Sequence, residues 1–211
     1  MAMLSPLTDD QTPEAVAQVL GRVRDMFGES PLPEMFRVYA HVEPFLRDFY
    51  MNFKKFVFSS GALDAQQKAA IALAVAANAK CPPWINWLSN RCQELGFSSP
   101  QVAEILAVGA TNAMYNTFFK FRDLSGSSIF EGMGVGLRAH TFNSVSLGEP
   151  LVELINIAIS DINACKPCTT GHVEKARQLG ISNEQLLECV QCAATIYAGC
   201  QFLNAAESCT G

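Results

Sequence analysis

The chain contains an internal repeat, and this repeat constrains its fold more than any other feature of the sequence. When residues 69–118 are shifted by 84 positions onto residues 153–202, the two segments align without a gap and 12 of the 50 pairs are identical. In each copy a helix leads into a Cys, a second helix ends at Leu-Gly, a Ser caps a third helix, and a fourth helix follows Ala-Thr. The sequence therefore predicts a duplicated helical unit that packs on itself.

Helical patterns extend over nearly the whole chain, and residues 12–121 contain no convincing alternation of apolar and polar positions. We therefore predict an all-α fold of two pseudo-equivalent halves in a single domain, 1–211. Four segments follow from the repeat: aromatic-rich N-terminal helices (1–63), a degenerate copy (64–122), a Gly- and Ser-rich connection (123–148) and a copy with a cysteine motif (149–211). We expect a helix break near Pro44, and aromatic side chains in the core or at a subunit interface.

Composition and charge argue against several classes of partner. Charged residues make up 17% of the chain, below the roughly 25% of typical soluble domains, so its surface is either poor in charge or partly buried in an oligomer. The net charge of -5 argues against nucleic acid and anionic membranes, which both need a basic surface. The sequence shows neither a signal peptide nor a run of about 18 apolar residues. We therefore expect a cytoplasmic protein that does not enter a membrane.

The two copies differ in chemistry at three of four aligned positions, where the first copy is apolar. The second copy has Glu153, Cys165, Cys168 and His172, and the first has Ala69, Cys81, Trp84 and Leu88. This difference suggests that the second copy performs chemistry and that the first supports it.

The spacing of these residues favours thiol chemistry. Cys165, Cys168 and His172 are spaced i, i+3 and i, i+4, so they share one face of a helix. If Cys165 begins that helix, its positive end favours thiolate formation, and His172 can take the proton from Cys168. Glu153 lies in a polar stripe with Asn156 and Ser160 on the preceding helix. A carboxylate there can fix the tautomer of His172 and raise its basicity.

Simpler interpretations stay open at this point. A single Cys-x-x-Cys is moderately common, and an isolated Glu153 or His172 is more often an ordinary polar residue. Zinc bound by two cysteines and a histidine is possible, although no fourth ligand is evident; we expect neither metal nor cofactor. Cys209 is uninformative. We interpret the following cysteines as buried small apolar residues: Cys92, Cys189, Cys192 and Cys200.

The pattern Glu-x11-Cys-x2-Cys-x3-His resembles the active-site signature of the alkylhydroperoxidase D family, within the carboxymuconolactone decarboxylase-like superfamily. Three flanking segments also resemble that superfamily: MYNTFFKFRDL (114–124), GLR (136–138) and TIYAGCQFLNA (195–205). The resemblance covers roughly residues 64–206. Well-known members have a His between the two cysteines, where this chain has Pro167.

This resemblance implies an all-α, duplicated fold that assembles as trimers or hexamers. It implies reduction of a small hydroperoxide, or of protein or lipoyl disulfides, with electrons passing from a dihydrolipoyl protein to a peroxiredoxin. Carried over by position, Cys168 with His172 is the peroxide-attacking thiol, Cys165 is its exposed disulfide partner, and Glu153 is the far end of a proton relay. The alternatives are a lyase of the carboxymuconolactone decarboxylase type and a non-enzymatic zinc or binding module.

Overall fold

A computed structural model describes residues 4–208, and within this range the chain forms helices and no strands. The all-α prediction is therefore confirmed. The helices are η1 (Asp9–Gln11), α1 (Glu14–Phe27), α2 (Glu34–Tyr39), α3 (Glu43–Phe53), η2 (Lys54–Phe58, a π-helical turn), α4 (Ala65–Asn78), α5 (Pro82–Glu94), α6 (Ser99–Leu124), η3 (Ser128–Phe130), α7 (His140–Ser144), α8 (Glu149–Ile162), α9 (Lys166–Gln178) and α10 (Asn183–Ser208).

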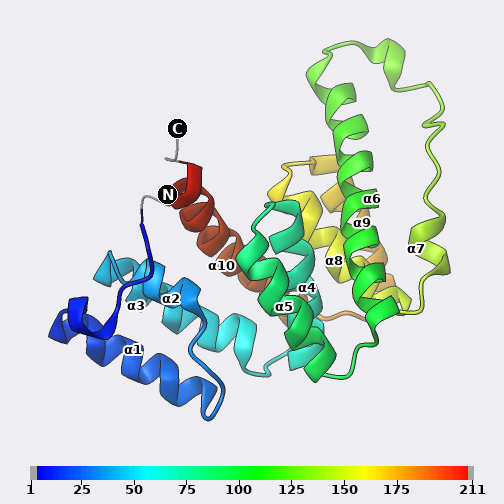
Figure 1. The fold of residues 1–211 in the computed structure, drawn as a ribbon. Helices are drawn as coiled ribbons and strands as arrows, with labels where there is room; N and C mark the ends of the chain where they lie inside the picture. The colour runs from blue at the N-terminus through cyan, green and yellow to red at the C-terminus, as the bar shows by residue number, and fades with distance from the viewer. Residues whose placement is uncertain (1–3, 209–211) are drawn as a thin grey trace.

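The two repeat copies correspond to α4–α5–α6 and α8–α9–α10 (Figure 1). The first helix of each copy forms the centre of the molecule. Every residue from Lys68 to Ala76 in α4 and from Leu151 to Ser160 in α8 is buried. Helices α4 and α8 contact each other, and each of them also contacts α6 and α10. The apolar side chains of α4 surround its axis, which is the pattern of a helix buried on all sides.

Each copy consists of three helices in the described part of the chain, so the prediction of a fourth helix after Ala-Thr is wrong. Ala110-Thr111 lies within α6, and Ala194-Thr195 lies within α10. Neither dipeptide breaks the helix, because a Thr hydroxyl can bond to the carbonyl of the preceding turn without displacing the backbone hydrogen bonds. The Thr195 hydroxyl does so, donating to the Gln191 carbonyl at 2.8 Å.

The turn before the second helix of each copy is the same in both halves. Lys80 and Ala164 have left-handed backbone conformations, with φ of 54° and 53°. The next residue, Cys81 or Cys165, is the N-cap of α5 or α9. This turn ends the first helix and reverses the chain, so it brings each cysteine to the start of a helix. The predicted Ser caps are also present, at Ser98 and its counterpart in the second copy.

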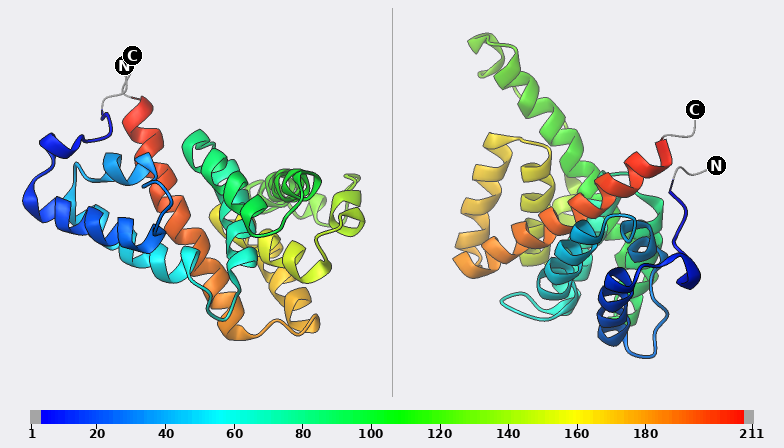
Figure 2. Two further views of the ribbon diagram at one scale, coloured as in Figure 1. Left: turned by 60° about the horizontal axis from the view of Figure 1, so that its bottom comes forward. Right: turned by 90° about the vertical axis from the view of Figure 1, so that its left-hand side faces the viewer.

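The N-terminal helices α1–α3 form one side of the molecule, where α2 and α3 lie along α10 (Figure 2). Phe36 and Phe53 pack on Trp84 of α5, and the Trp84 indole N–H donates to the Tyr39 hydroxyl at 2.7 Å. The aromatic stripe therefore forms core. The expected break falls between α2 and α3, where Pro44 occupies the first turn of α3.

A buried ion pair connects α4 to α10. Lys68 is fully buried, and its ammonium group donates to Glu188 Oε1 at 2.8 Å and to the Ser59 carbonyl at 2.7 Å. The other oxygen of Glu188 accepts from the Leu63 N–H at 2.6 Å. Burial alone would raise the pKa of Glu188, but the contact with Lys68 and the backbone N–H groups outweighs burial and lowers it. The pair holds the loop before α4 against α10.

Two features set the outline of the molecule. No residue of α6 beyond Asn116 is buried, so the end of α6 projects as an arm, and the chain returns along it to α7 (Figure 1). Among the described helices, α10 alone has the length and hydropathy of a membrane span, in residues 183–206. This was not expected from the sequence, which has no unbroken run of about 18 apolar residues. Helix α10 packs against α2, α3, α4 and α8, as a core helix does.

Candidate active site

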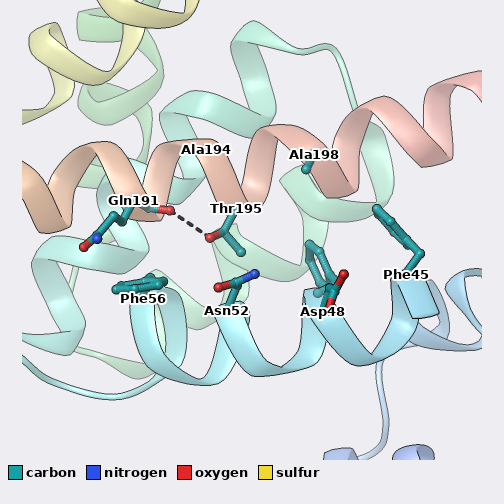
Figure 3. A pocket seen from close by; sticks show the side chains of 9 residues that line it. Phe45, Asp48, Asn52, Phe56, Gln191, Ala194, Thr195 and Ala198 are labelled. Atoms are coloured by element: carbon teal, nitrogen blue, oxygen red, sulfur yellow. Dashed lines mark hydrogen bonds between the residues drawn. The ribbon is translucent and has the colours of Figure 1, made fainter. Parts of the chain in front are cut away.

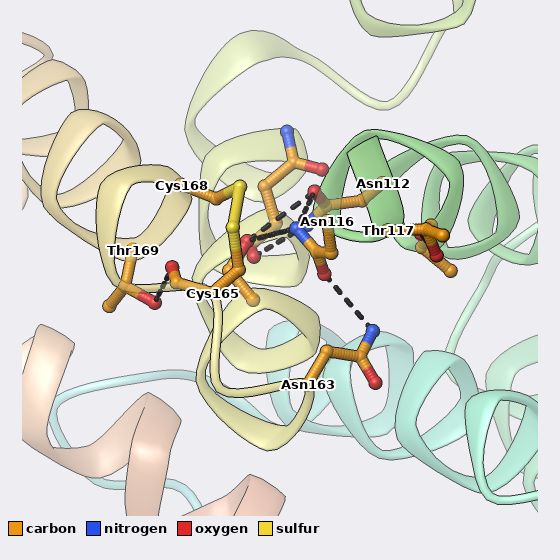
Figure 4. The surroundings of a disulfide bond; sticks show 10 residues. Asn112, Asn116, Thr117, Asn163, Cys165, Cys168 and Thr169 are labelled. Carbon is orange, nitrogen blue, oxygen red and sulfur yellow. Dashed lines mark hydrogen bonds between the residues drawn. A yellow bond between two sulfur atoms is a disulfide. The ribbon is translucent and has the colours of Figure 1, made fainter. Parts of the chain in front are cut away.

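A disulfide joins Cys165 to Cys168 at the start of α9, with their Cα atoms 5.3 Å apart (Figure 4). Cys165 is the N-cap of α9, and Pro167 lies in the first turn of that helix. Proline fits this position because it has no N–H to leave unpaired. The structure thus brings together the two cysteines of the motif at a helix N-terminus, as their spacing predicts.

The resemblance implies that Cys165 is the exposed cysteine of the pair, and this is wrong. In the disulfide-bonded chain Cys165 is fully buried, whereas Cys168 retains 8% exposure. The reason is the turn between α8 and α9: the Cys165 N–H donates to the Ser160 carbonyl at 2.9 Å, which holds this cysteine against α8. Cys168 lies one turn further along α9. Of the two cysteines, Cys168 is therefore the less buried.

Glu153 of α8 and His172 of α9 are in direct contact. Glu153 Oε2 lies 2.7 Å from His172 Nδ1, and Oε1 lies 3.0 Å from the ammonium group of Lys175. The Glu153 side chain is 2% exposed and that of His172 is 20% exposed. Burial raises the pKa of Glu153, but its contacts with His172 and Lys175 outweigh burial, so the net pKa lies below its usual value. Glu153 is therefore a carboxylate at neutral pH.

The carboxylate determines the tautomer of His172. Because Nδ1 faces an ionised oxygen, Nδ1 carries the proton, and in the neutral ring Nε2 is left as the basic nitrogen. Nε2 makes no hydrogen bond to another residue in the described part of the chain. The ring of Phe142, from α7, packs edge-on against His172 with centroids 6.2 Å apart.

Sequence reasoning missed Lys175, Phe142 and the α6 side of the site. Lys175 follows His172 by three residues, a spacing that places both on one helix face, so this contact could have been found from the sequence. The contact of Phe142 could not, because α7 reaches His172 only through the tertiary fold.

Two asparagines from α6 complete the surroundings of the disulfide (Figure 4). Asn112 Nδ2 donates to the Asn156 carbonyl at 2.7 Å and to Ser160 Oγ at 3.0 Å. Asn116 Nδ2 donates to Asn112 Oδ1 at 3.0 Å and to Ser160 Oγ at 3.1 Å. Asn163 Nδ2 donates to Asn116 Oδ1 at 3.0 Å. The polar stripe of α8 is therefore part of a buried hydrogen-bond network that spans α6 and α8.

A hollow of about 610 Å³ adjoins the disulfide-bonded turn. It is lined by Phe119 and Arg122 of α6, by residues between 123 and 131, and by Pro167. The Arg122 guanidinium lies over the Phe119 ring, 5.5 Å from its centroid. Because Pro167 stands between the two cysteines, this hollow opens beside the motif, and we call it the vestibule.

The four cysteines of α5 and α10 are buried, as predicted. Cys92, Cys189, Cys192 and Cys200 have no exposed surface. Burial raises the pKa of Cys92 and of Cys192 to about 12 and raises that of Cys189 well above its usual range. A hydrogen bond with Cys81, together with burial, raises the pKa of Cys200. These thiols are poor nucleophiles at neutral pH. Cys209 lies outside the described residues.

No group of three or more His, Cys, Asp or Glu side chains within residues 4–208 is arranged to hold a metal ion. The absence of metal from the native protein stays a prediction, to be tested on the purified chain.

A second hollow, of about 400 Å³, lies between α3 and α10 (Figure 3). None of the motif residues lines it. Phe45 and Phe56 line one side, and Ala194, Thr195 and Ala198 line the other. Its lining contains neither thiol nor imidazole, so it lacks the groups for thiol chemistry.

Comparison with known proteins identifies the family. The model of the carboxymuconolactone decarboxylase family matches residues 44–121 and 135–208, once for each repeat copy. A protein of Anaeromyxobacter sp. (strain Fw109-5), named alkyl hydroperoxide reductase AhpD, is 30% identical over 161 residues, covering 76% of this chain and 86% of that protein. A protein of the same name from Koribacter versatilis (strain Ellin345) is 27% identical over 167 residues, covering 79% of this chain and 85% of that protein.

The first family match begins at residue 44, so the family region includes α3 as well as the six repeat helices. These matches extend over more than half of the chain and include both copies of the repeat. The chain therefore belongs to the carboxymuconolactone decarboxylase family, and it is similar to the alkylhydroperoxidase D proteins within it.

Proposed function

We propose that this protein is an enzyme of peroxide metabolism that reduces a small organic hydroperoxide through the Cys165–Cys168 pair. The observation that carries the proposal is the disulfide at the start of α9, one turn from a histidine that is bonded to a buried carboxylate. The names of the similar proteins, alkyl hydroperoxide reductase, support the same chemistry.

The first step is attack of the Cys168 thiolate on the hydroxyl oxygen of the hydroperoxide. The S–O bond forms and the O–O bond breaks, so the peroxide is reduced by two electrons and Cys168 is oxidised to a sulfenic acid. The alkoxide leaves and becomes an alcohol when it takes the proton held by His172. Cys165 then attacks the sulfenic sulfur, and water leaves as the disulfide forms. An external dithiol reduces this disulfide and restores both thiols.

His172 has two roles in this scheme. It takes the proton of Cys168 before the attack and donates that proton to the leaving alkoxide. Glu153 orients the ring through Nδ1 and stabilises the imidazolium, so Nε2 is the nitrogen that exchanges the proton. Lys175 neutralises the second oxygen of Glu153 and holds the carboxylate in place.

The proposed path of the reductant is the vestibule, whose lining includes Pro167, between the two cysteines, but neither cysteine itself. A thiol carried on an extended arm can approach through a hollow of this size more easily than a thiol on a flat protein surface. A dihydrolipoyl protein is therefore the proposed electron donor, and a peroxiredoxin is a proposed acceptor when the chain acts in disulfide exchange. A cytoplasmic location is proposed with it, because a recyclable dithiol needs a reducing compartment.

We also propose that the protein is a homo-oligomer, a trimer or hexamer. The support is a set of exposed apolar side chains on the arm formed by the end of α6 and the following loop: Phe121, Leu124, Ile129 and Met133. Sedimentation equilibrium tests this, and a monomer at micromolar concentration would contradict it.

The decisive experiment measures hydroperoxide consumption by the fully reduced protein with dihydrolipoamide as electron donor. Cys168→Ala removes the attacking sulfur, so we expect activity to fall to background. Cys192→Ala is the matched control, because it also removes a buried thiol from a helix but lies outside the motif. Equal activity in wild type and Cys168→Ala would refute the proposal. A zinc-dependent structural role or lactone decarboxylation without the thiols would then be the alternative.

A further inference from the structure

The side chain of Asn156, on α8, is fully buried, and neither atom of its amide has a hydrogen-bond partner among the described residues. Its backbone carbonyl accepts from Asn112, so only the side chain is unpaired. Buried polar groups are nearly always paired, because an unpaired one loses its hydration without compensation. An unpaired NH2 group and an unpaired carbonyl oxygen at the same position therefore indicate a missing ligand.

The fold itself does not require an asparagine at this position. The repeat offset of 84 residues pairs Asn156 with Ala72 of α4, which is also fully buried. The other two polar residues of the stripe, Glu153 and Ser160, pair with alanines as well. The copy without the cysteine motif thus forms the same buried helix with alanine at all three positions. The three polar residues therefore occur only in the copy that carries the cysteine motif, and the packing of the helix does not require them.

The location of Asn156 follows from its two neighbours in the stripe. Glu153, one turn earlier in α8, contacts His172. The hydroxyl oxygen of Ser160, one turn later, accepts from Asn112 and Asn116 of α6. Residues i, i+3 and i+7 lie on one face of a helix. Asn156 therefore lies on the face of α8 where α6 and α9 meet, between the base on α9 and the asparagines of α6 that surround the disulfide.

The amides around Asn156 have their own partners. Asn112 and Asn116 bond to each other and to Ser160, and Asn163 bonds to Asn116. The unpaired amide can therefore take a small molecule that itself offers one donor and one acceptor. A hydroperoxide group, –O–O–H, has this composition.

We propose that Asn156 binds the –O–O–H group of the hydroperoxide beside Cys168, an inference that rests on the proposed function. Its Oδ1 accepts from the hydroxyl of the hydroperoxide. Its Nδ2 donates to the alkyl-bearing oxygen, which gains negative charge as the O–O bond breaks and leaves as alcohol. A donor placed at the oxygen where charge develops stabilises the transition state more than the ground state.

The test compares Asn156→Ala and Asn156→Leu with Asn204→Ala. The first variant installs the residue of the other copy, and the second keeps the volume without the polar atoms. Asn204→Ala is the control, since it also removes a side-chain amide, but this amide lies on α10 outside the site and is paired, donating to the Ala79 carbonyl at 2.7 Å. Three quantities are measured for each: the rate constant for oxidation of Cys168 by hydroperoxide, the alkylation rate of Cys168 against pH, and the midpoint of thermal unfolding.

We expect both Asn156 variants to lose about 100-fold in the peroxide rate constant, the size of effect seen when one donor to a developing oxyanion is removed. Their alkylation profiles should match the wild type, because the thiolate population is unchanged. Their unfolding midpoints should be equal or higher, because an unpaired polar group is gone. Asn204→Ala should show the opposite pattern, with a lower midpoint and a peroxide rate constant close to that of the wild type.

Three results would overturn the proposal. Peroxide rate constants near wild type in both Asn156 variants would mean that the amide holds structural water at most. An alkylation profile shifted as far as the peroxide rate would mean that Asn156 acts on the thiol and not on the substrate. If the wild-type thiols themselves do not react with hydroperoxide, the proposed function fails first and this inference fails with it.

Discussion

Replacement of Glu153 by glutamine tests the carboxylate–imidazole pair while the shape of the site is kept. In the wild type the ionised Glu153 faces His172 Nδ1 at 2.7 Å, with its side chain almost fully buried. A hydrogen bond to a charged group contributes about 1.5–3 kcal/mol. If this stabilisation applies to the imidazolium formed when Cys168 loses its proton, its loss lowers the peroxide rate by about 10- to 100-fold, since 1.36 kcal/mol is tenfold in rate.

The effect on stability is smaller than the effect on rate. In Glu153→Gln the Lys175 ammonium, which is 41% exposed, can turn to solvent, so no charge is left buried without a partner. We expect a loss of about 1 kcal/mol at neutral pH. Because the native pKa of Glu153 is lowered, the carboxylate stabilises the fold above its unfolded pKa of about 4.3. That contribution disappears as the pH falls through the native value, so the two proteins should converge in stability in acid.

The assay is the alkylation rate of Cys168 as a function of pH, in Glu153→Gln, His172→Ala and the double variant. A free thiol titrates near 8.5, and loss of the base should move the apparent pKa of Cys168 upward. His172→Ala should lower peroxide consumption at pH 7 by about 100-fold, the usual contribution of a general base. The double variant should be little worse than the poorer single variant, because the two residues act as one unit. Superimposable profiles in all four proteins would refute the relay.

Three further predictions follow from the same structure. Elemental analysis of the native protein should find no stoichiometric metal, and one zinc per chain would contradict this. Limited peroxide oxidation followed by mass mapping should give a Cys165–Cys168 bridge before any Cys189–Cys192 bridge, because the second pair is fully buried; the reverse order would mean that the wrong pair was chosen. Lys68→Met should lower the free energy of unfolding by about 3 kcal/mol, because it removes the cation that neutralises the largely buried Glu188 carboxylate. A urea titration within 1 kcal/mol of wild type would contradict that reasoning.

The sequence by itself determined the elements that depend on local spacing. The duplicated pattern, the Ser caps and the Leu-Gly helix ends all reappear in the structure, because caps and left-handed residues act through the backbone of their own turn. The common helix face of Cys165, Cys168 and His172 follows from the 3.6-residue period alone. The same reasoning failed at Ala-Thr, which repeats in both copies but lies inside two long helices.

Only the tertiary structure decided how the helices meet. Glu153 precedes His172 by 19 residues, and their contact depends on the angle at which α9 returns along α8. The asparagines of α6 come from the other repeat copy, and their role was invisible in the motif. The buried position of Cys165 likewise results from the turn that presses it against α8. The spacing of residues along one helix fixes the direction in which each side chain leaves the helix axis. Contacts between helices depend instead on packing over the whole core, which no local pattern encodes.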